Sequence, residues 1–555
     1  MKDQSSYSRR LRFARYTRCM TRAQRADVVV VGGGLAGIVT ALQLLRGGQR
    51  VILVDRDTPA HFGGLAYWAF GGMALIDTPL QRRMKIQDSP EQALADWLSF
   101  GELDPGDRWS RAWAEHYVTH SRTGVYDWLM AEGLRFMPAV NWVERGRFGD
   151  GNSVPRYHIV WGTARELVKQ LGGALHTAAP AQHLSLLHQH RVTGLVHSAG
   201  QVSGVHAVNE LTGEAVELQA EQVVLAMGGV NGSHSQCHKH WPADRPRPAQ
   251  MLNGAHPNAD GQLHAYSQQY LGAQLVNAGE MWNYAAGIGH SRPLFPGHGL
   301  STIPCKSALW LNHRGERIGP EPLVTGFDTH WLCQRVAAQS QPWTWHLLNW
   351  RIAIKEFAIS GAEHNPRIRD KQLIPFIKDT LFGQTDLIRR MQAESDDVLV
   401  DDTLSGLAQK MNALTRSHHV DPAVLQATVA DFDANFGQRG GCNDAQIRMI
   451  EHARQWRPDR LRTCKPAPLS QPGAGPYIAM HLQLITRKSL GGLRTDLSSR
   501  VLDADHAPIA GLYCVGEAAG FGGGGMHGKR SLEGTFLPSC VLTAQAAARA
   551  ILAGG

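Results

Sequence analysis

The chain has 555 residues, of which 43% are hydrophobic, so it can bury more than one domain core. Its formal charge of +8 is concentrated before position 26, where eight basic residues against one acidic residue give +7. Because the rest is close to neutral and no run of 18 apolar residues occurs, the sequence argues against a nucleic-acid partner and a membrane span.

Residues 1–25 are predicted to be a basic extension or a tag. Residues 8–13 resemble a twin-arginine export signal, but further arginines interrupt the run where an apolar core should follow. Translation from Met20 is a simpler explanation of this segment. The eight cysteines contain no Cys-x-x-Cys pair, which favours free thiols over a disulfide framework. We therefore predict a cytoplasmic protein.

The first folded element is predicted to be a β-α-β unit that binds a dinucleotide. Four valines form a buried strand, helical apolar spacing follows, and a second strand ends at Asp55. Gly32 permits a tight turn, Gly34 a close approach to a pyrophosphate, and Gly37 close packing of helix on strand. Asp55 lies 21 residues after Gly34, where a carboxylate accepts hydrogen bonds from a ribose. This part of the predicted cofactor site also includes Leu35, Ala36 and Arg56.

Two glycine pairs follow, Gly63-Gly64 and Gly71-Gly72, around an aromatic segment. Paired glycines let the backbone lie against a phosphate or a flat ring, and the aromatic side chains at 67–70 suit the wall of a planar cofactor. The alternative is an ordinary glycine-rich turn on an aromatic core cluster.

Helices are predicted at 91–100, 108–131 and 163–171, and short strands alternate with turns over 172–225. The last of these strands runs into a glycine turn, and Asp260 is a predicted helix cap a little later. We add four residues from this region to the cofactor site: Ala226, Met227, Gly228 and Asp260.

Histidines and a cysteine at 234–240 have the softness and spacing of zinc ligands. No companion cluster follows in the second half of the chain, so we interpret this segment as a polar loop and predict no metal site.

Residues 284–465 differ from their surroundings, with tryptophans, a helical run predicted at 344–357 and no second glycine fingerprint. We interpret them as a largely helical capping and substrate domain. Residues 26–283 and 466–555 would then be two halves of one cofactor-binding domain. The second half resumes the glycine-rich pattern at 491–492 and 511–516 and ends in an amphipathic helix at 536–553.

Together these motifs resemble the flavoprotein family of fumarate reductase and succinate dehydrogenase flavoprotein subunits and 3-ketosteroid Δ1-dehydrogenases. The likeness covers nearly the whole chain after residue 26, and residues 491–496 are most similar to the ketosteroid dehydrogenase branch. It implies bound FAD and an α/β fold: a Rossmann-like FAD-binding domain, split in sequence, with an inserted, largely helical α+β capping domain.

The resemblance implies a role in FAD binding for each motif. The glycine pairs lie beside phosphate and ring, and Gly516 and Glu517 lie along the ribityl chain. The last helix would direct its N-terminal dipole, near Pro538 and Ser539, at the flavin edge. Leu65 stands where membrane-complex members carry the histidine that attaches FAD covalently, so non-covalent FAD is predicted.

Fumarate reduction is disfavoured, because the dicarboxylate-binding positions of that branch differ here. Arg487 and Lys488 stand where its histidines would be, and after His527 the expected arginine comes one position early, as Arg530.

The predicted reaction is dehydrogenation of a CH–CH bond next to a carbonyl in a small-molecule substrate, or the reverse enoate reduction. Such chemistry needs a base, a hydride path and donors to the enolate. Tyr284 is the predicted base if its pKa is lowered, for example by Arg487; the alternative is a tyrosine that only packs at the domain boundary. The other predicted catalytic residues are His527, Arg530 and Arg487, with Tyr477 and Glu533 as weaker candidates.

The chain has no iron–sulfur or heme cysteine spacing, so an external electron acceptor or donor is expected. Two alternatives remain open at this point: a flavin amine or alcohol oxidase, and a non-catalytic flavin electron-transfer subunit. An intact capping domain argues against the second, because a pure carrier needs no lid.

Overall fold

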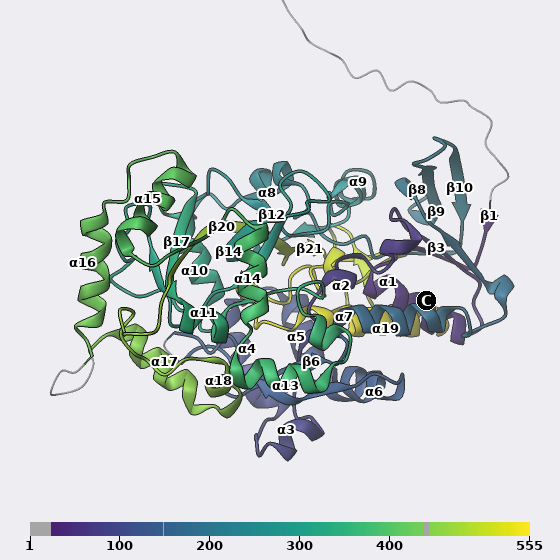
Figure 1. Cartoon of the computed structure of the whole chain (residues 1–555). Coiled ribbons are helices and arrows are strands. Elements are labelled where there is room, and N and C mark those ends of the chain that lie inside the picture. The colour runs from purple at the N-terminus through teal and green to yellow at the C-terminus, as the bar shows by residue number, and fades with distance from the viewer. Residues whose placement is uncertain (1–23, 148, 437–442, 555) are drawn as a thin grey trace, which may run out of the picture.

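The computed structural model describes residues 24–147, 149–436 and 443–554. Two large sheets organise the chain, and helices cover them (Figure 1). The twin-arginine-like segment and Met20 lie outside the described residues. Within the described ranges six cysteines are free thiols, and no helix is both long and apolar enough to cross a bilayer.

The first sheet is built around five parallel neighbours, β23, β11, β2, β3 and β7. Val28 and Val30 of β2 face one core, whereas Val29 and Val31 face another, as the alternation of a strand requires. In spatial order the strands are β1 (Gln24–Arg25), β10 (Ala215–Gln219), β9 (Gln201–Asn209), β23 (Pro508–Cys514), β11 (Gln222–Leu225), β2 (Val28–Val31), β3 (Val51–Val54) and β7 (Leu184–Leu187), with β8 (His190–Ser198) beside β9 and β22 (Arg500–Leu502) beside β23.

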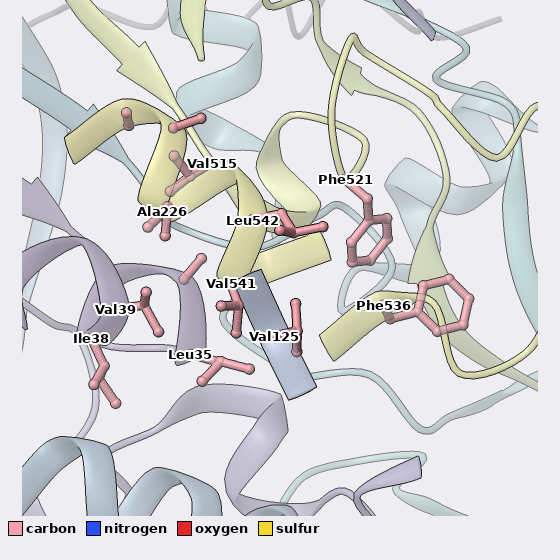
Figure 2. Close-up of a cluster of buried hydrophobic side chains, with 14 of the residues drawn as sticks. Leu35, Ile38, Val39, Val125, Ala226, Val515, Phe521, Phe536, Val541 and Leu542 are labelled. Atoms are coloured by element: carbon pink, nitrogen blue, oxygen red, sulfur yellow. The ribbon is translucent and has the colours of Figure 1, made fainter. Parts of the chain in front are cut away.

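Helices α1 (Leu35–Arg46), α7 (Thr163–Leu175) and α19 (Phe536–Leu552) pack on one face of this sheet. Figure 2 shows Ile38 and Val39 of α1 on one side of this core and Val541 and Leu542 of α19 on the other. The first and last helices of the described chain therefore share one hydrophobic core. The predicted β-α-β unit and terminal helix are confirmed.

The second sheet is built around β20 (Tyr477–Ser489), a strand of 13 residues. It lies between β17 and β14 and also pairs with two short strands. The other strands are β16 (Leu309–Leu311), β17 (Trp343–Asn349), β14 (Met281–Gly289), β15 (Gly299–Ile303), β18 (Ala358–Ile359), β12 (Leu252–Asn253) and β19 (Val398–Asp401).

The helical run predicted at 344–357 is wrong in its first half, which forms strand β17. A short helix, α11 (Trp350–Glu356), begins only after Asn349, whose side chain accepts the N–H of Ile352 as a cap. β17 is buried along nearly its whole length. A short apolar run buried on both faces gives no periodicity by which strand and helix can be told apart.

Other helices surround the two sheets, and those predicted at 91–100 and 108–131 are confirmed, the latter with a π-helical segment at 121–127. Around the first sheet and between the sheets lie α2 (Gly64–Trp68), α3 (Pro79–Arg83), α4 (Pro90–Gly101), α5 (Arg108–His120), α6 (Trp128–Ala131), α8 (His234–His240), α9 (Gln262–Leu271) and the strands β4 (Gly72–Ala74), β5 (Phe136–Asn141), β6 (Tyr157–Val160), β13 (Leu275–Val276) and β21 (Gly492–Leu493). The middle of the chain adds α10 (Thr329–Ala337), α12 (Pro366–Arg369), α13 (Leu373–Phe382), α14 (Thr385–Glu394), α15 (Leu404–Thr415), α16 (Pro422–Asp433), α17 (Ala445–Gln455) and α18 (Arg457–Arg462).

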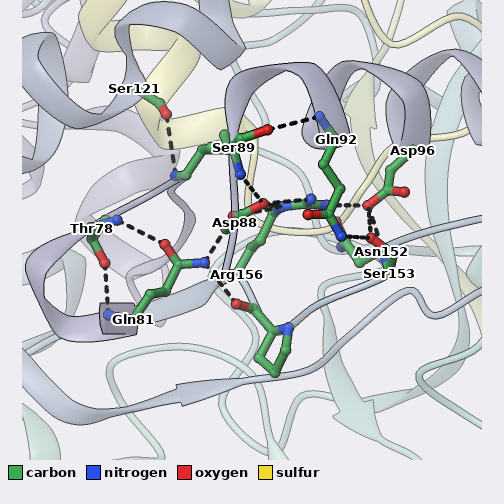
Figure 3. A network of polar contacts seen from close by, with 12 residues as sticks. Thr78, Gln81, Asp88, Ser89, Gln92, Asp96, Ser121, Asn152, Ser153 and Arg156 are labelled. Atoms are coloured by element: carbon green, nitrogen blue, oxygen red, sulfur yellow. Dashed lines mark hydrogen bonds and ion pairs between the residues drawn. The ribbon is translucent and has the colours of Figure 1, made fainter. Parts of the chain in front are cut away.

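A buried ion-pair network ties the strand β6 region to α4. The side chain of Arg156 is 2% exposed and lies 2.8 Å from Asp88 and 2.5 Å from Asp96, with Asn152 as a further acceptor (Figure 3). Because Asp88 is fully buried, the charge of its carboxylate depends on Arg156 for compensation.

Replacing Arg156 by methionine should lower the free energy of unfolding by about 3–5 kcal/mol, the usual cost of leaving a buried charge unpaired. The change keeps the apolar stem and removes the guanidinium. Urea unfolding at neutral pH measures the effect. Arg50→Met breaks a largely exposed pair with Asp27 and serves as the control, with a much smaller effect expected. Equal losses in the two variants would contradict the assignment.

Candidate active site

Two adjoining cavities meet at one wall. The glycine groove runs along Gly32, Gly34 and Gly64, and the large cavity, of about 1630 Å³, extends between β14, β15, β5, α13 and α18. Both are lined by the same five residues: Phe70, Tyr157, Tyr284, Ser360 and Glu533. A molecule in the groove and one in the cavity would therefore meet at these side chains.

The glycine groove gathers most of the predicted cofactor residues, although they come from distant parts of the chain. Its lining includes Gly32, Gly34, Leu35, Ala36, Asp55, Arg56, Gly63, Gly64, Gly71, Gly72, Ala226, Met227, Gly228, Asp260 and Glu517.

The three glycines of the first turn differ in what surrounds them. A Cβ on Gly32 would lie 2.5 Å from the carbonyl oxygen of Ala226, and one on Gly37 would lie 1.9 Å from that of Gly32. A Cβ on Gly34 would meet no atom within 4 Å, because this position faces the open groove. Gly32 and Gly37 are thus required by the fold, while Gly34 leaves space for a ligand.

The groove fits a dinucleotide such as FAD. Helix α1 begins at its rim with no side-chain cap and no acidic residue in its first turn, so its N-terminal N–H groups are available to a phosphate. Asp55 is held by the N–H groups of Gly33 and Asp57, and each carboxylate oxygen keeps a lone pair for a ribose hydroxyl. Burial raises the pKa of Asp55. Arg487 also lines the groove, and its buried Nε has no hydrogen-bond partner among the described residues.

Arg56 and Asp260 form one side of the groove. Arg56 pairs with Asp260 at 3.1 Å and with Glu210 at 3.0 Å. Asp260 also accepts the N–H of Gln262 at the start of α9, so the predicted cap lies one position before the formal cap residue, Gly261.

Four predicted cofactor residues do not line the groove. Gly37 packs beneath the turn, and the N–H of Gly516 donates to Thr543. Pro538 and Ser539 are buried on another side of α19, which presents Phe536, Leu537 and Cys540 to the groove instead. The helix begins at Phe536, as predicted, but successive residues of a helix point about 100° apart, so Pro538 and Ser539 point away from the side, formed by Phe536, Leu537 and Cys540, that faces the groove.

A cluster of polar groups lies at the shared wall, and we call Tyr284, Glu533, Lys488 and Trp282 the Tyr284 cluster. The Tyr284 hydroxyl donates to Glu533 Oε2 at 2.9 Å, and the Trp282 indole donates to the same oxygen at 2.7 Å. Lys488 Nζ is 3.3 Å from the Tyr284 hydroxyl oxygen. Strands β14 and β20 build this arrangement, because their pairing sets Trp282 opposite Lys488.

The electrostatics of the cluster differ from the prediction. Burial and then the charge of Glu533 raise the pKa of Tyr284 well above 10, and these effects outweigh Arg487. The expected lowering of the Tyr284 pKa is therefore wrong. The pKa that falls is that of Lys488, which burial lowers to about 8. Arg487 itself donates to the carbonyl of Gly254 at 2.6 Å.

His527 and Arg530 lie outside the linings of both cavities. His527 is fully buried, stacks on Trp97 and hydrogen-bonds Thr535 at 2.6 Å; burial lowers its pKa to about 3. Arg530 pairs with Asp328 at 2.8 Å and Glu102 at 2.9 Å. Both side chains thus hold the structure around the start of α19: His527 bonds its cap residue Thr535, and Arg530 links the preceding loop to Asp328 and Glu102.

Sequence reasoning missed Tyr157 and gave Lys488 and Glu533 little weight. Tyr157 lies on β6, and its ring packs so closely over Gly72 that a Cβ there would overlap it. No local pattern marks these residues, since Glu533 is 249 positions from Tyr284 along the chain. Sequence reasoning also missed that the ring of Trp68 stacks on that of His256 in the groove wall, with ring centroids 5.0 Å apart.

The segment at 234–240, predicted to be a polar loop, is the short helix α8, which begins after the cap Ser233. Its Cys237 is buried.

A separate group of three potential metal ligands is found among the described residues: His290, Glu363 and His364. His290 Nδ1 accepts the N–H of Arg292 at 2.9 Å, and His364 Nδ1 is 3.5 Å from the Arg390 guanidinium. An imidazole that accepts at Nδ1 carries its proton on Nε2, so the atoms near Glu363 are donors. The Nε2 atoms of His290 and His364 lie 3.6 and 4.0 Å from a Glu363 oxygen, so we interpret this group as an electrostatic cluster.

Glu144 is a buried acid in the large cavity. It accepts hydrogen bonds from the hydroxyl and, at 3.1 Å, the backbone N–H of Thr329. Burial raises its pKa to about 8. At neutral pH the side chain therefore carries a proton.

Stability should depend on pH through Glu144. In the unfolded chain its pKa is near 4.5, so between pH 4.5 and about 8 the folded state holds a proton that the unfolded state has released. The free energy of unfolding should therefore fall as pH rises across this window, and Glu144→Gln should flatten the fall. Urea unfolding at several pH values tests this, with exposed Glu115→Gln as the control. Identical pH profiles in both variants would refute it.

Comparisons with known proteins agree with this geometry. A family model described as FAD binding domain matches residues 27–537. KsdD-like steroid dehydrogenases of Mycolicibacterium smegmatis and Mycobacterium tuberculosis are 40% and 39% identical, over 92% and 94% of this chain and 96% and 95% of theirs. The solved 3-ketosteroid Δ1-dehydrogenase of Sterolibacterium denitrificans shares the fold, with a TM-score of 0.69, 17% identity and coverage of 96% of this chain and 100% of that one. The chain thus belongs to the FAD binding domain family, together with the KsdD-like steroid dehydrogenases, and is an FAD-dependent oxidoreductase of CH–CH bonds.

Proposed function

We propose that the enzyme acts on a steroid-like ketone, removing two hydrogens from the CH–CH bond next to the carbonyl, or adding them in reverse. The observation that carries this proposal is the Tyr284 cluster at the wall between the groove and the large cavity. The cavity exceeds the roughly 300–1,000 Å³ of common small-molecule sites, which suits a rigid multi-ring body. The relatives named steroid dehydrogenases favour the same substrate class.

The groove residues would hold FAD by its phosphates at α1, its ribose at Asp55 and its ring side near Gly71 and Glu517. FAD, when bound, supplies the two-electron acceptor for a hydride that leaves the carbon beside the deprotonated one. Leu65 lines the groove and offers no nucleophile, so we propose non-covalent attachment.

The Tyr284 cluster would move the proton. Tyr284 takes the acidic proton alpha to the carbonyl as its own proton passes to Glu533, so no free tyrosinate has to form. The Lys488 ammonium, 3.3 Å from the hydroxyl, stabilises negative charge as it develops there. Tyr157, on the same wall, is placed to donate to the carbonyl oxygen. His527 and Arg530 act as positioning residues.

The sequence division into domains remains part of this proposal. Residues 26–283 and 466–555 would form the FAD-binding part and residues 284–465 most of the capping part. Separate hydrophobic cores in the two sheets support this division. The free thiols favour a reducing compartment such as the cytoplasm, and electrons would pass to or from an external partner.

An anaerobic substrate screen tests the function. Purified enzyme is mixed with 3-ketosteroids, enoates, amines and alcohols in turn, and the visible flavin absorption and the product mass are followed. We expect a ketosteroid to bleach the flavin and to lose two hydrogens. Bleaching by amines or alcohols alone would favour an oxidase, and electron exchange only with a protein partner would favour a carrier subunit.

A further inference from the structure

Two cationic side chains line the large cavity outside the wall that it shares with the glycine groove. Lys306 follows β15 and Arg462 ends α18, and both are half-buried. Neither has an ion pair or a side-chain hydrogen bond to any residue in the described ranges. Burial lowers the pKa of Arg462, because its guanidinium loses water and gains no direct acceptor. The N–H groups of both side chains are therefore available to a ligand in the cavity.

A buried carboxylate brings these two side chains into one region. Glu356 accepts the backbone N–H of Ser307 at 3.0 Å and that of Cys464 at 2.6 Å. Lys306 directly precedes the first of these donors, and Arg462 lies two positions before the second. The Ser307 hydroxyl donates to the same carboxylate at 2.6 Å. Neutral donors thus take most of the acceptor capacity of Glu356.

The other acids of this region are also engaged. Asp459 forms an ion pair with Arg145, and Asp379 forms one with Arg367 at 3.1 Å. Arg367 also lies 4.0 Å from Asp386, whose side chain is 91% exposed. These acids moderate the positive potential of the cavity, but neither unpaired cation donates a hydrogen bond to any of them among the described residues. The feature that remains is a pair of cationic donors without acceptors.

Helix α13 adds an apolar wall to the same cavity. Ile374, Ile377 and Phe382 are 81%, 47% and 74% exposed, and all three belong to the cavity lining. Figure 1 shows α13 beside α18, the helix that ends at Arg462. Covering such side chains with an apolar ligand is favourable, because it removes their surface from water. The cavity therefore suits a molecule with an apolar body and an anionic end.

We propose that Lys306 and Arg462 bind a carboxylate on the side chain of the substrate, so that the enzyme acts on ketosteroid acids. This inference rests on the proposed function for the ring system of the substrate. Ammonium and guanidinium groups donate charge-assisted hydrogen bonds to carboxylates, and a guanidinium can donate two in parallel. The cavity volume of about 1630 Å³ leaves room for a side chain beyond the rings.

A purely structural role for the two cations is the alternative. If they only compensated the charge of Glu356, removing one of them would weaken acidic and neutral ligands alike. The ratio of the two affinities therefore separates the alternatives, because only a direct contact with the ligand carboxylate changes it.

Binding and turnover by the FAD-loaded enzyme at pH 7 test the proposal. The probes are a Δ4-3-ketosteroid with a side-chain carboxylic acid and the methyl ester of the same compound, each followed by calorimetry and by anaerobic flavin bleaching. The variants are Arg462→Met and Lys306→Met, which keep the apolar stems, and Arg462→Lys, which keeps the charge. Lys169→Met is the control, because Lys169 is exposed on α7 and lies outside both cavities.

We expect the wild type and Lys169→Met to bind the acid about tenfold or more tightly than the ester, the gain expected of one charge-assisted hydrogen bond. Arg462→Met and Lys306→Met should each bring this ratio close to one, and Arg462→Lys should keep part of it. Added salt should lower the ratio in the wild type.

Two results would overturn the proposal: equal affinity of the wild type for acid and ester, or a ratio that both methionine variants keep. Either result, combined with bleaching by both compounds, would leave the ketosteroid chemistry intact. Preferential binding of the acid that depends on Arg462, without bleaching by either compound, would support the carboxylate site and reject the proposed reaction.

Discussion

Gly34→Ala should leave the chain folded and remove its FAD. The backbone at Gly34 has φ −71° and ψ 179°, which alanine adopts freely, and the new methyl group would touch no protein atom. It would instead project into the groove where the pyrophosphate must approach the backbone. We expect FAD affinity to fall by about 100-fold or more, since every 1.4 kcal/mol lost is about tenfold. Visible absorption of the purified protein and titration with FAD measure the loss.

Substitutions at two other glycines serve as comparisons for this test. Gly173→Ala adds a methyl group that also meets no atom within 4 Å, but on α7 away from the groove, and should keep full FAD content. Gly37→Ala would place a Cβ 1.9 Å from a carbonyl oxygen and should lower the unfolding midpoint. A Gly34→Ala protein that stays yellow with unchanged affinity would mean that the phosphates do not lie at this turn.

Tyr284→Phe should retain FAD but lose about 10²–10⁴-fold in kcat, the usual contribution of a positioned acid–base group. The substitution removes one oxygen and leaves the ring, so packing on β14 is preserved. It breaks the path from substrate to Glu533 and the contact with Lys488. Steady-state kinetics with the ketone found in the substrate screen, together with FAD content, separate a chemical effect from a loss of cofactor.

Controls for this prediction come from the same structure. Tyr266→Phe removes a hydroxyl that donates to a carbonyl outside both cavities and should keep normal kcat. Glu533→Gln should resemble Tyr284→Phe, and the double variant should be little worse than the poorer single one, because the two act as a unit. If Tyr284→Phe keeps kcat within threefold of the wild type, the proton must leave by another route.

The elements that the sequence predicted correctly are those set by local chemistry. The glycine turn, the strand of valines and Asp55 lie within 29 residues of one another, and each has a conformational reason to be there. The family resemblance, with FAD, followed from such segments and is confirmed.

The errors arise where contacts between residues far apart in the sequence determine the structure. The sequence of β17 resembles that of a helix because the strand is buried on both faces. The start of α19 was predicted correctly, but which of its sides faces the groove is set by packing against distant segments, and Pro538 and Ser539 lie on another side. The proposed catalytic arrangement was the hardest part to predict, because Tyr284 and Lys488 are 204 residues apart in sequence and only strand pairing brings them together. His527 looked reactive by residue type, but its neighbours bury it.

Strand β20 limits how this molecule can be divided. It comes after residue 465 in sequence, yet it is the strand between β17 and β14 in the second sheet, and its end places Lys488 in the candidate active site. A fragment of residues 284–465 would therefore leave unpaired the edges of β14 and β17 that bond to β20. A fragment that lacks residues 284–465 would leave both edges of β20 unpaired. Chimeras between relatives should exchange the middle of the chain and this strand together, or not at all.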